Sequence, residues 1–115
     1  MHELAIADSV LKVVEAEAAR RPDARIVKVG LRVGELAGVD PDALSFSFEV
    51  LVRGTKLEPL LLEIERCPRR HHCRLCGCTF AVADFEAACP ECGAAQTQCI
   101  AGDELELAYL EVEEP

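Results

Sequence analysis

Two matched cysteine pairs constrain the fold of this chain more than any other feature of its sequence. Each pair has the form Cys-x-x-Cys-Gly, and twelve residues separate the two pairs. Two thiolates held two residues apart grip one side of a metal ion, and the glycine lets the backbone turn so that amide N–H groups point at the sulfurs. Two such knuckles facing each other supply four soft ligands in a closed tetrahedral set. The sequence therefore predicts a zinc ribbon with the ligands Cys73, Cys76, Cys89 and Cys92.

Two alternatives to structural zinc stay open at this point. Iron also accepts a tetrahedral four-sulfur site, as in a rubredoxin-like carrier. The other alternative is that the four cysteines merely fill an apolar core. A closed four-sulfur zinc site does no chemistry of its own, so with zinc bound the function has to come from another part of the chain.

Length and charge narrow the class of protein. A chain of 115 residues fits one ordinary domain, or a small core domain with a metal-stapled lobe. Its net charge of −9 would repel a phosphate backbone, so we do not expect nucleic acid as a partner. No apolar run is long enough for a membrane span and no secretory leader is recognisable, so a membrane partner is not expected. The chain has seven cysteines, an odd number, and the spacing of the pairs suits metal binding better than a disulfide framework. These features favour the reducing environment of the cytoplasm.

Two helices are expected from apolar periodicity and capping residues. The first begins almost at Met1 and ends before Pro22. The second begins at Asp40-Pro41 and ends before Gly54, although the alternation over residues 44–52 also allows a strand. The inward faces would be Leu4, Ala7, Leu11, Val14 and Ala18 in the first helix, and Leu44, Phe48 and Leu51 in the second.

Three strands are expected outside the cysteine pairs, over residues 27–34, residues 60–65 and from residue 105 onward. In the last of these the apolar phase shifts after Tyr109, which indicates a β-bulge. We expect this strand to join the sheet formed by the first two strands, because a sheet of only two strands would be marginally stable. The inward residues would be Val27, Val29, Leu31 and Val33, then Leu60, Leu62 and Ile64, then Leu105, Leu107 and Tyr109.

These elements predict an α+β fold with two lobes. The first lobe is a small helix-backed β-sheet made of residues 1–66 and 101–115. The second lobe is the zinc ribbon of residues 67–100, which is inserted between the second and third strands.

The opening tripeptide Met1-His2-Glu3 is a second candidate metal site. Histidine at position two is too bulky for the usual removal of methionine, so Met1 would keep a free α-amine. The α-amine, the backbone nitrogen of His2 and the His2 imidazole then form fused five- and six-membered chelate rings in one plane, which Ni²⁺ or Cu²⁺ prefers. The fourth position is left to Glu3 or to an outside ligand. The alternative is that His2 is merely solvated and that Glu3 favours a helix N-terminus.

The whole chain resembles the HypA/HybF family of hydrogenase-maturation nickel chaperones. The resemblance is carried by Met1-His2-Glu3 with Ile6-Ala7, by Val33-Gly34-Glu35-Leu36-Ala37-Gly38-Val39, by Phe46, Phe48 and Glu49, by Gly54-Thr55, by both knuckles and by Gly102-Asp103-Glu104-Leu105-Glu106-Leu107.

This resemblance implies a nickel site at the terminus, with His2 as the nickel-binding histidine and Met1 and Glu3 beside it, and structural zinc on the four cysteines. It also implies delivery of nickel to the large-subunit precursor of nickel–iron hydrogenase with a HypB-type GTPase, and in some members a urease accessory protein as partner. We expect a monomer or a weak homodimer in the cytoplasm.

An enzymatic role is not expected. The chain has no Gly-x-x-x-x-Gly-Lys-Ser/Thr segment for a nucleotide cycle of its own, and no nucleophile in a recognisable triad context. A carrier that needs a separate energy-coupled partner fits these features. The competing interpretation is a zinc-ribbon interaction or nucleic-acid-binding module.

Several residues near the knuckles fall outside the four-cysteine pattern. The extra thiols are either small buried hydrophobic residues or exchangeable metal ligands, and the two histidines next to the first knuckle are candidate replacement ligands. A basic run in this acidic protein is either a solvated face or a docking patch for an acidic partner. These residues are Cys67, Cys78, Cys99, His71 and His72, and the arginines Arg66, Arg69, Arg70 and Arg74.

Overall fold

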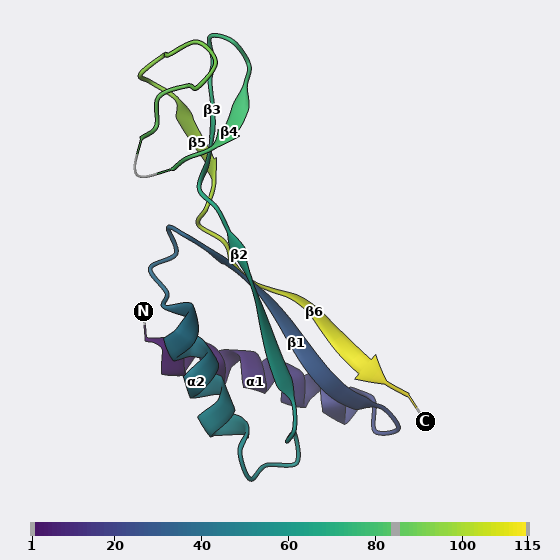
Figure 1. Cartoon of the computed structure of the whole chain (residues 1–115). Coiled ribbons are helices and arrows are strands. Elements are labelled where there is room, and N and C mark those ends of the chain that lie inside the picture. The colour runs from purple at the N-terminus through teal and green to yellow at the C-terminus, as the bar shows by residue number, and fades with distance from the viewer. Residues whose placement is uncertain (1, 84–85, 115) are drawn as a thin grey trace.

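A long central strand organises the larger of two lobes. The computed structural model describes residues 2–83 and 86–114. Its elements run in the order α1 (Glu3–Arg20), β1 (Arg25–Gly34), α2 (Pro41–Val52), β2 (Leu61–Cys67), β3 (Arg70–His72), β4 (Thr79–Ala81), β5 (Gln98–Ala101) and β6 (Leu105–Glu113). Strand β1 pairs in parallel with β2 and antiparallel with β6, which gives a large sheet with the order β2-β1-β6. Both helices lie on one face of this sheet (Figure 1).

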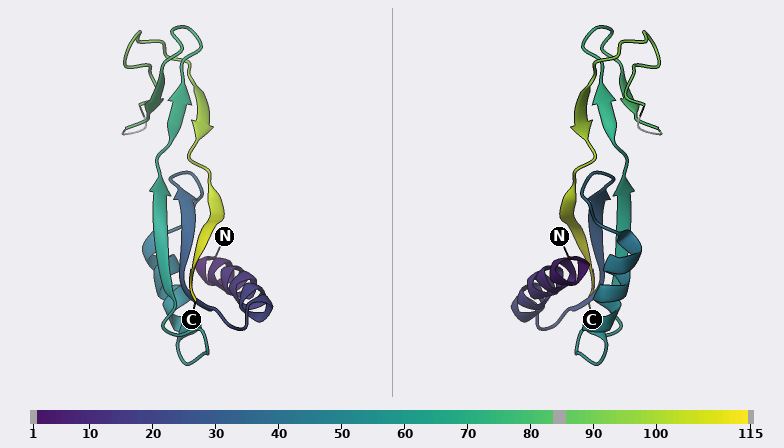
Figure 2. Two further views of the ribbon diagram at one scale, coloured as in Figure 1. Left: turned by 90° about the vertical axis from the view of Figure 1, so that its right-hand side faces the viewer. Right: turned by 90° about the vertical axis from the view of Figure 1, so that its left-hand side faces the viewer.

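The small lobe carries its own sheet, with the order β4-β3-β5 and antiparallel pairing throughout. The two sheets follow one another along the long axis of the molecule, and the two connecting segments run side by side between them (Figure 2). The radius of gyration is 18.1 Å, whereas a compact chain of this length would have about 13 Å. The molecule is therefore elongated, with extents of 55 × 27 × 16 Å.

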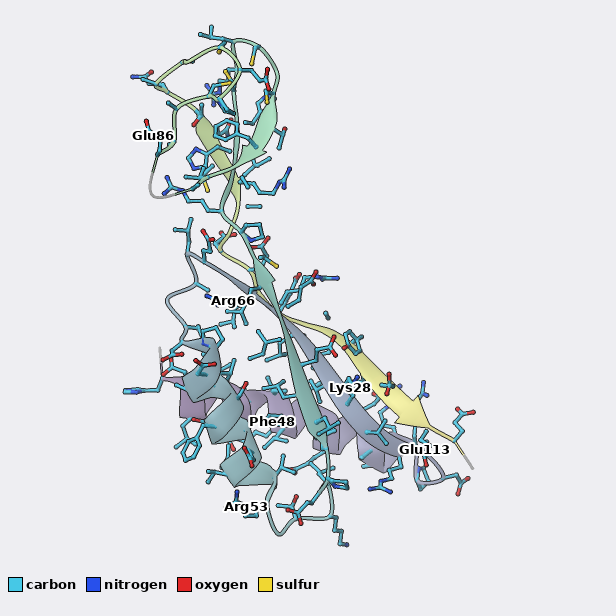
Figure 3. The ribbon with its side chains drawn as sticks, viewed as in Figure 1. Lys28, Phe48, Arg53, Arg66, Glu86 and Glu113 are labelled. Atoms are coloured by element: carbon cyan, nitrogen blue, oxygen red, sulfur yellow. The ribbon has the colours of Figure 1, made fainter. Side chains whose placement is uncertain are left out.

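The core of the large lobe is aliphatic except for Phe48 and lies between the helices and the sheet. Helix α2 forms as predicted, because the Asp40 side chain accepts the N–H groups of Asp42 and Ala43 and Pro41 occupies the first turn. Phe48 lies between α2 and the sheet (Figure 3). The strand alternative for residues 44–52 is therefore wrong. The buried core consists of Ile6, Ala7, Leu11, Val14, Ile26, Val29, Leu31, Val33, Leu44, Phe48, Val52 and Leu60.

The predicted inward face of α1 was wrong at one position. Leu4 is 53 % exposed, whereas Ile6 is buried. Leu4 lies at the edge of the apolar stripe, and the sequence pattern does not say which edge faces the sheet. Neither helix in the described part of the chain has the length and apolar character that a membrane crossing requires.

The bulge predicted in β6 is confirmed, but one residue earlier than the phase shift suggested. Gly30 pairs with Tyr109 and Leu31 pairs with Leu107, so Ala108 is the extra residue. The Tyr109 side chain therefore lies on the face opposite to Leu107, and its ring covers Gly30 on the open face of the sheet. The prediction of Leu105, Leu107 and Tyr109 as inward residues was wrong, because all three are exposed at this edge strand. A second irregularity makes Val27 the extra residue in β1, which explains why Ile26 is buried and Val27 is only half-buried.

The end of β1 ties both connecting segments to the large lobe. The Glu35 N–H donates to the carbonyl of Cys67 at 3.0 Å, on the segment that leaves for the small lobe. The Leu36 N–H donates to the carbonyl of Gly102 at 2.6 Å, on the segment that returns. Gly34 packs so closely against Gly102 that a Cβ would overlap the backbone carbonyl. The orientation of the small lobe therefore depends on this junction.

Gly34→Ala is expected to destabilise the chain by about 3 kcal/mol, because the new methyl group meets rigid backbone. The matched variant is Gly30→Ala, for which the three atoms nearest to the new methyl group all belong to the Tyr109 ring. That ring can swing away, so the expected cost is about 1 kcal/mol. Urea denaturation followed by far-UV circular dichroism measures both values, and equal losses would contradict this account of the junction.

Candidate metal centres

The four cysteines of the two knuckles come together in the small lobe. Their sulfur atoms all lie within 4.8 Å of one another. The Sγ atoms of Cys73 and Cys92 are 3.5 Å apart, and those of Cys76 and Cys89 are also 3.5 Å apart. A tetrahedral Zn²⁺ with Zn–S bonds of ~2.3 Å requires sulfur–sulfur separations of ~3.8 Å. The cluster therefore has the size of a single tetrahedral metal site.

The two knuckles share one backbone conformation. In the first, the Gly77 N–H donates to the carbonyl of Cys73 and the Cys73 N–H donates to the carbonyl of Cys78. The second repeats this pattern from Gly93 to Cys89 and from Cys89 to Ala94. The two glycines have φ angles of 78° and 75°, which residues with a Cβ rarely adopt. This turn is the local reason for the glycine that follows each cysteine pair.

Backbone amides and neighbouring thiols shift the pKa values of the four cysteines in opposite directions. A hydrogen bond from the backbone of Cys92 lowers the pKa of Cys89 to about 6, and the backbone of Cys76 likewise lowers the pKa of Cys73. The backbone of Cys78 acts to lower the pKa of Cys76, but the Cys89 thiol and burial raise it to about 12. Four thiolates cannot share this small volume without a cation, and a divalent metal supplies the compensating charge.

The cluster fits a structural metal better than a catalytic one. All four ligand positions of a tetrahedral ion would be taken by cysteine, which leaves no open position for water or a substrate. The small lobe also buries few side chains in its described part, namely His71, Cys73, Val82 and Cys89. A lobe with so small a core needs an additional cross-link to be stable, and the thiol cluster can provide one by binding a metal ion.

The three other cysteines lie outside the cluster. Cys67 is half-buried at the junction, and burial together with the nearby Glu104 raises its pKa. Cys78 is half-buried and close enough to Cys89 to feel its charge, although burial is the main reason that its pKa is raised. Cys99 is exposed on β5, so its interpretation as a buried hydrophobic residue is wrong.

The two histidines next to the first knuckle contact other groups, and His72 Nδ1 lies 3.5 Å from Thr79 Oγ1. His71 is buried, and its Nε2 accepts a hydrogen bond from Arg69 Nε at 2.9 Å. Its Nδ1 therefore donates to Thr97 Oγ1 at 2.8 Å, and that hydroxyl donates to the carbonyl of Ala87 at 2.6 Å. Burial and the Arg69 charge lower the pKa of His71. This chain of hydrogen bonds braces the loop that leads into the second knuckle.

His2 and Glu3 lie at the exposed start of α1, while Met1 is outside the described residues. His2 is the N-cap residue, and its carbonyl accepts the N–H of Ile6 at 3.2 Å. Glu3 is half-buried, and its carboxylate accepts the backbone N–H of Asp40 at 3.3 Å. The beginnings of the two helices therefore meet at the terminus, with Asp40 capping α2 and touching Glu3.

Sequence reasoning missed two neighbours of these centres. Asp40 was recognised as a cap, but 37 positions separate it from Glu3, and no local pattern links the two residues. Thr97 carries no signal in the sequence, because its role appears only when the loop folds over His71.

The chain matches known proteins along its length. A family model described as "Hydrogenase/urease nickel incorporation, metallochaperone, hypA" matches residues 1–112. The hydrogenase maturation factor HypA of Roseiflexus sp. is 45 % identical over 115 residues, which cover 99 % of this chain and 94 % of that protein. HypA of Geobacter metallireducens is 43 % identical over 113 residues, which cover 98 % of this chain and all of that protein.

Two solved structures share the fold. The solution structure of the nickel metallochaperone HypA from Helicobacter pylori aligns with a TM-score of 0.64 at 21 % identity, and the alignment covers both chains completely. A second solution structure of a HypA protein aligns with a TM-score of 0.67 at 23 % identity over 96 % of this chain and 95 % of the other. The sequence matches confirm the resemblance noted above, and the chain belongs to the HypA family of nickel metallochaperones for hydrogenase maturation.

Proposed function

We propose that this chain binds Ni²⁺ through Met1, His2 and Glu3 and delivers it to the large-subunit precursor of nickel–iron hydrogenase. A HypB-type GTPase would assist the transfer, and a urease accessory protein would be a second partner. Family membership together with an exposed His2 at the very start of α1 carries this proposal. Nickel is cargo here, so an open and incomplete site suits binding followed by release.

The first turn of α1 supports the proposed chelate. The first N–H groups of a helix have no acceptor within the helix, so the backbone nitrogens of His2 and Glu3 can bind a metal without breaking a helical hydrogen bond. The Met1 α-amine, the His2 backbone nitrogen and the His2 imidazole would offer three nitrogens in one plane, and the fourth position is left to Glu3 or to an outside ligand.

The Glu3 carboxylate has a supporting role in this proposal. Its contact with the Asp40 N–H holds the start of α1 against the start of α2. The side chains of Glu3 and Asp40 also put negative charge beside the terminus, which favours an incoming cation. The planar nitrogens would bind nickel directly, and these two acids would steer it.

We also propose that Cys73, Cys76, Cys89 and Cys92 hold a structural Zn²⁺. Zinc suits a closed set of four thiolates and has no redox chemistry. Residues 67–100 would then fold as a metal-dependent lobe, while residues 1–66 and 101–115 form the nickel-binding lobe. In this arrangement zinc stabilises the fold and takes no part in nickel transfer.

Cys89→Ser is expected to abolish zinc binding and to unfold the small lobe, because three thiolates and few buried side chains cannot hold it. The large lobe should keep its helices and sheet. The measurements are zinc per chain by metal analysis and amide signals of the two lobes by NMR. Cys99→Ser is the matched control, since this exposed thiol lies outside the cluster and its loss should leave one zinc per chain. A full complement of zinc in Cys89→Ser would contradict the four-cysteine assignment and point to Cys78 as a ligand.

An N-terminal extension is expected to abolish nickel binding while every residue of the chain is kept. Extension or acetylation of Met1 turns the α-amine into a non-basic amide, so the planar chelate loses its anchor. Native protein should show a weak visible absorption band on addition of Ni²⁺, and the extended protein should lack it.

His2→Gln should match the extended protein, whereas zinc content and secondary structure should be the same in all three proteins. Nickel binding by the extended protein with an unchanged spectrum would rule out the terminus as the site.

A further inference from the structure

The open face of the small sheet carries basic side chains whose cross-strand partners are neutral. Along β3, Arg70 and His72 point to the face opposite the buried His71, because side chains alternate along a strand. Arg70 pairs with Ala81 on β4 and with Ala101 on β5. His72 pairs with Thr79 and Gln98, so neither residue has an acidic neighbour across the sheet.

Arg74 extends this row beyond the end of β3. Its guanidinium donates to Gln98 Oε1 at 3.0 Å and 3.3 Å, which anchors it beside His72 without neutralising its charge. Arg69 does not belong to the row, because its guanidinium binds the buried His71. Arg66 lies near the top of the large sheet (Figure 3). The basic face of the small lobe therefore consists of Arg70, His72 and Arg74.

The cations on the open face of the large sheet have the opposite environment. Lys28 Nζ lies 3.4 Å from Glu63, and the Arg32 guanidinium lies 2.9 Å from Glu106 and 3.1 Å from Glu65. Every ion pair among the described residues is in the large lobe. The large sheet thus neutralises its own cations, whereas the basic face keeps its positive charge available to a partner.

We propose that the basic face is a docking site for a carboxylate-rich, extended segment of a partner protein. Residues Arg70 and His72 are two positions apart on a strand and so about 7 Å apart, which is the spacing of alternate side chains in any extended peptide. A segment with an acid at every second position would match this row. The inference requires only a folded small lobe, so it is independent of nickel binding.

Two other occupants fit the face less well. A row of three basic residues is short for the continuous phosphate backbone of a nucleic acid. A second copy of this chain would have to offer the glutamates of its large sheet, but Lys28 and Arg32 already bind three of them. A short carboxylate-rich segment matches the length of this row, and its acids are not already paired within the chain.

The test is an NMR titration of zinc-loaded, full-length protein with a synthetic peptide of alternating glutamate and serine, at low salt. Amide shifts are expected at Arg70, His72 and Arg74 and at their neighbours Thr79 and Gln98. The double variant Arg70→Gln/Arg74→Gln should bind about tenfold more weakly or worse. The matched control Arg21→Gln/Arg53→Gln loses the same charge from the large lobe and should bind as the native chain does.

A second variant distinguishes the loss of binding charge from a folding defect in the double variant. Ala81→Glu introduces a carboxylate directly opposite Arg70 and leaves both arginines in place. It should also weaken peptide binding about tenfold, with zinc content unchanged. A peptide with glutamine in place of glutamate should not bind to the native chain.

Several results would overturn the proposal. These are absence of peptide binding, shifts confined to the helices, or equal affinity in native protein and Arg70→Gln/Arg74→Gln. Tighter binding of a single-stranded RNA of equal charge at this face would make it a nucleic-acid site. Self-association in sedimentation that disappears in the double variant would make it an interface between copies of this chain.

Discussion

Backbone hydrogen bonds at the end of β1 are the constraint on which the rest of this structure depends. The small lobe is inserted between β2 and β6, so both of its ends must be held by the large lobe. Residues Glu35 and Leu36 hold them, one through the carbonyl of Cys67 and the other through the carbonyl of Gly102. The same short loop then leads to Asp40, which caps α2 and contacts Glu3. One loop thus fixes the base of the small lobe and the beginnings of both helices.

The two lobes are stabilised by different interactions. Twelve buried apolar residues form the core of the large lobe, and burial of apolar surface is sufficient to order a lobe of this kind. The small lobe buries little apolar surface, and its order rests on short strands, on the His71–Thr97 hydrogen bonds and on the thiol cluster. Such a division would suit the proposed carrier, in which a metal-dependent small lobe presents a surface to partners and the large lobe binds nickel.

Charge also differs between the lobes in a way that composition alone conceals. The chain is strongly acidic as a whole, yet its basic residues near the knuckles have no ion-pair partner among the described residues. Lys28 and Arg32 form ion pairs with glutamates on neighbouring strands of the large sheet. The cross-strand partners of Arg70 are alanines on both sides. The sign of a local surface is therefore set by strand register rather than by net charge.

The sequence by itself determined the helices, the strands of the large sheet and the grouping of the four cysteines. These features rest on local rules: apolar periodicity, the Asp40-Pro41 cap, and a glycine at positive φ after each cysteine pair. The tertiary structure alone decided that Tyr109 covers Gly30, that Leu4 is exposed, that Asp40 reaches Glu3 and that His71 binds Thr97. Each of these outcomes depends on the register or packing of residues far apart in the chain, and no local pattern encodes which distant groups will meet.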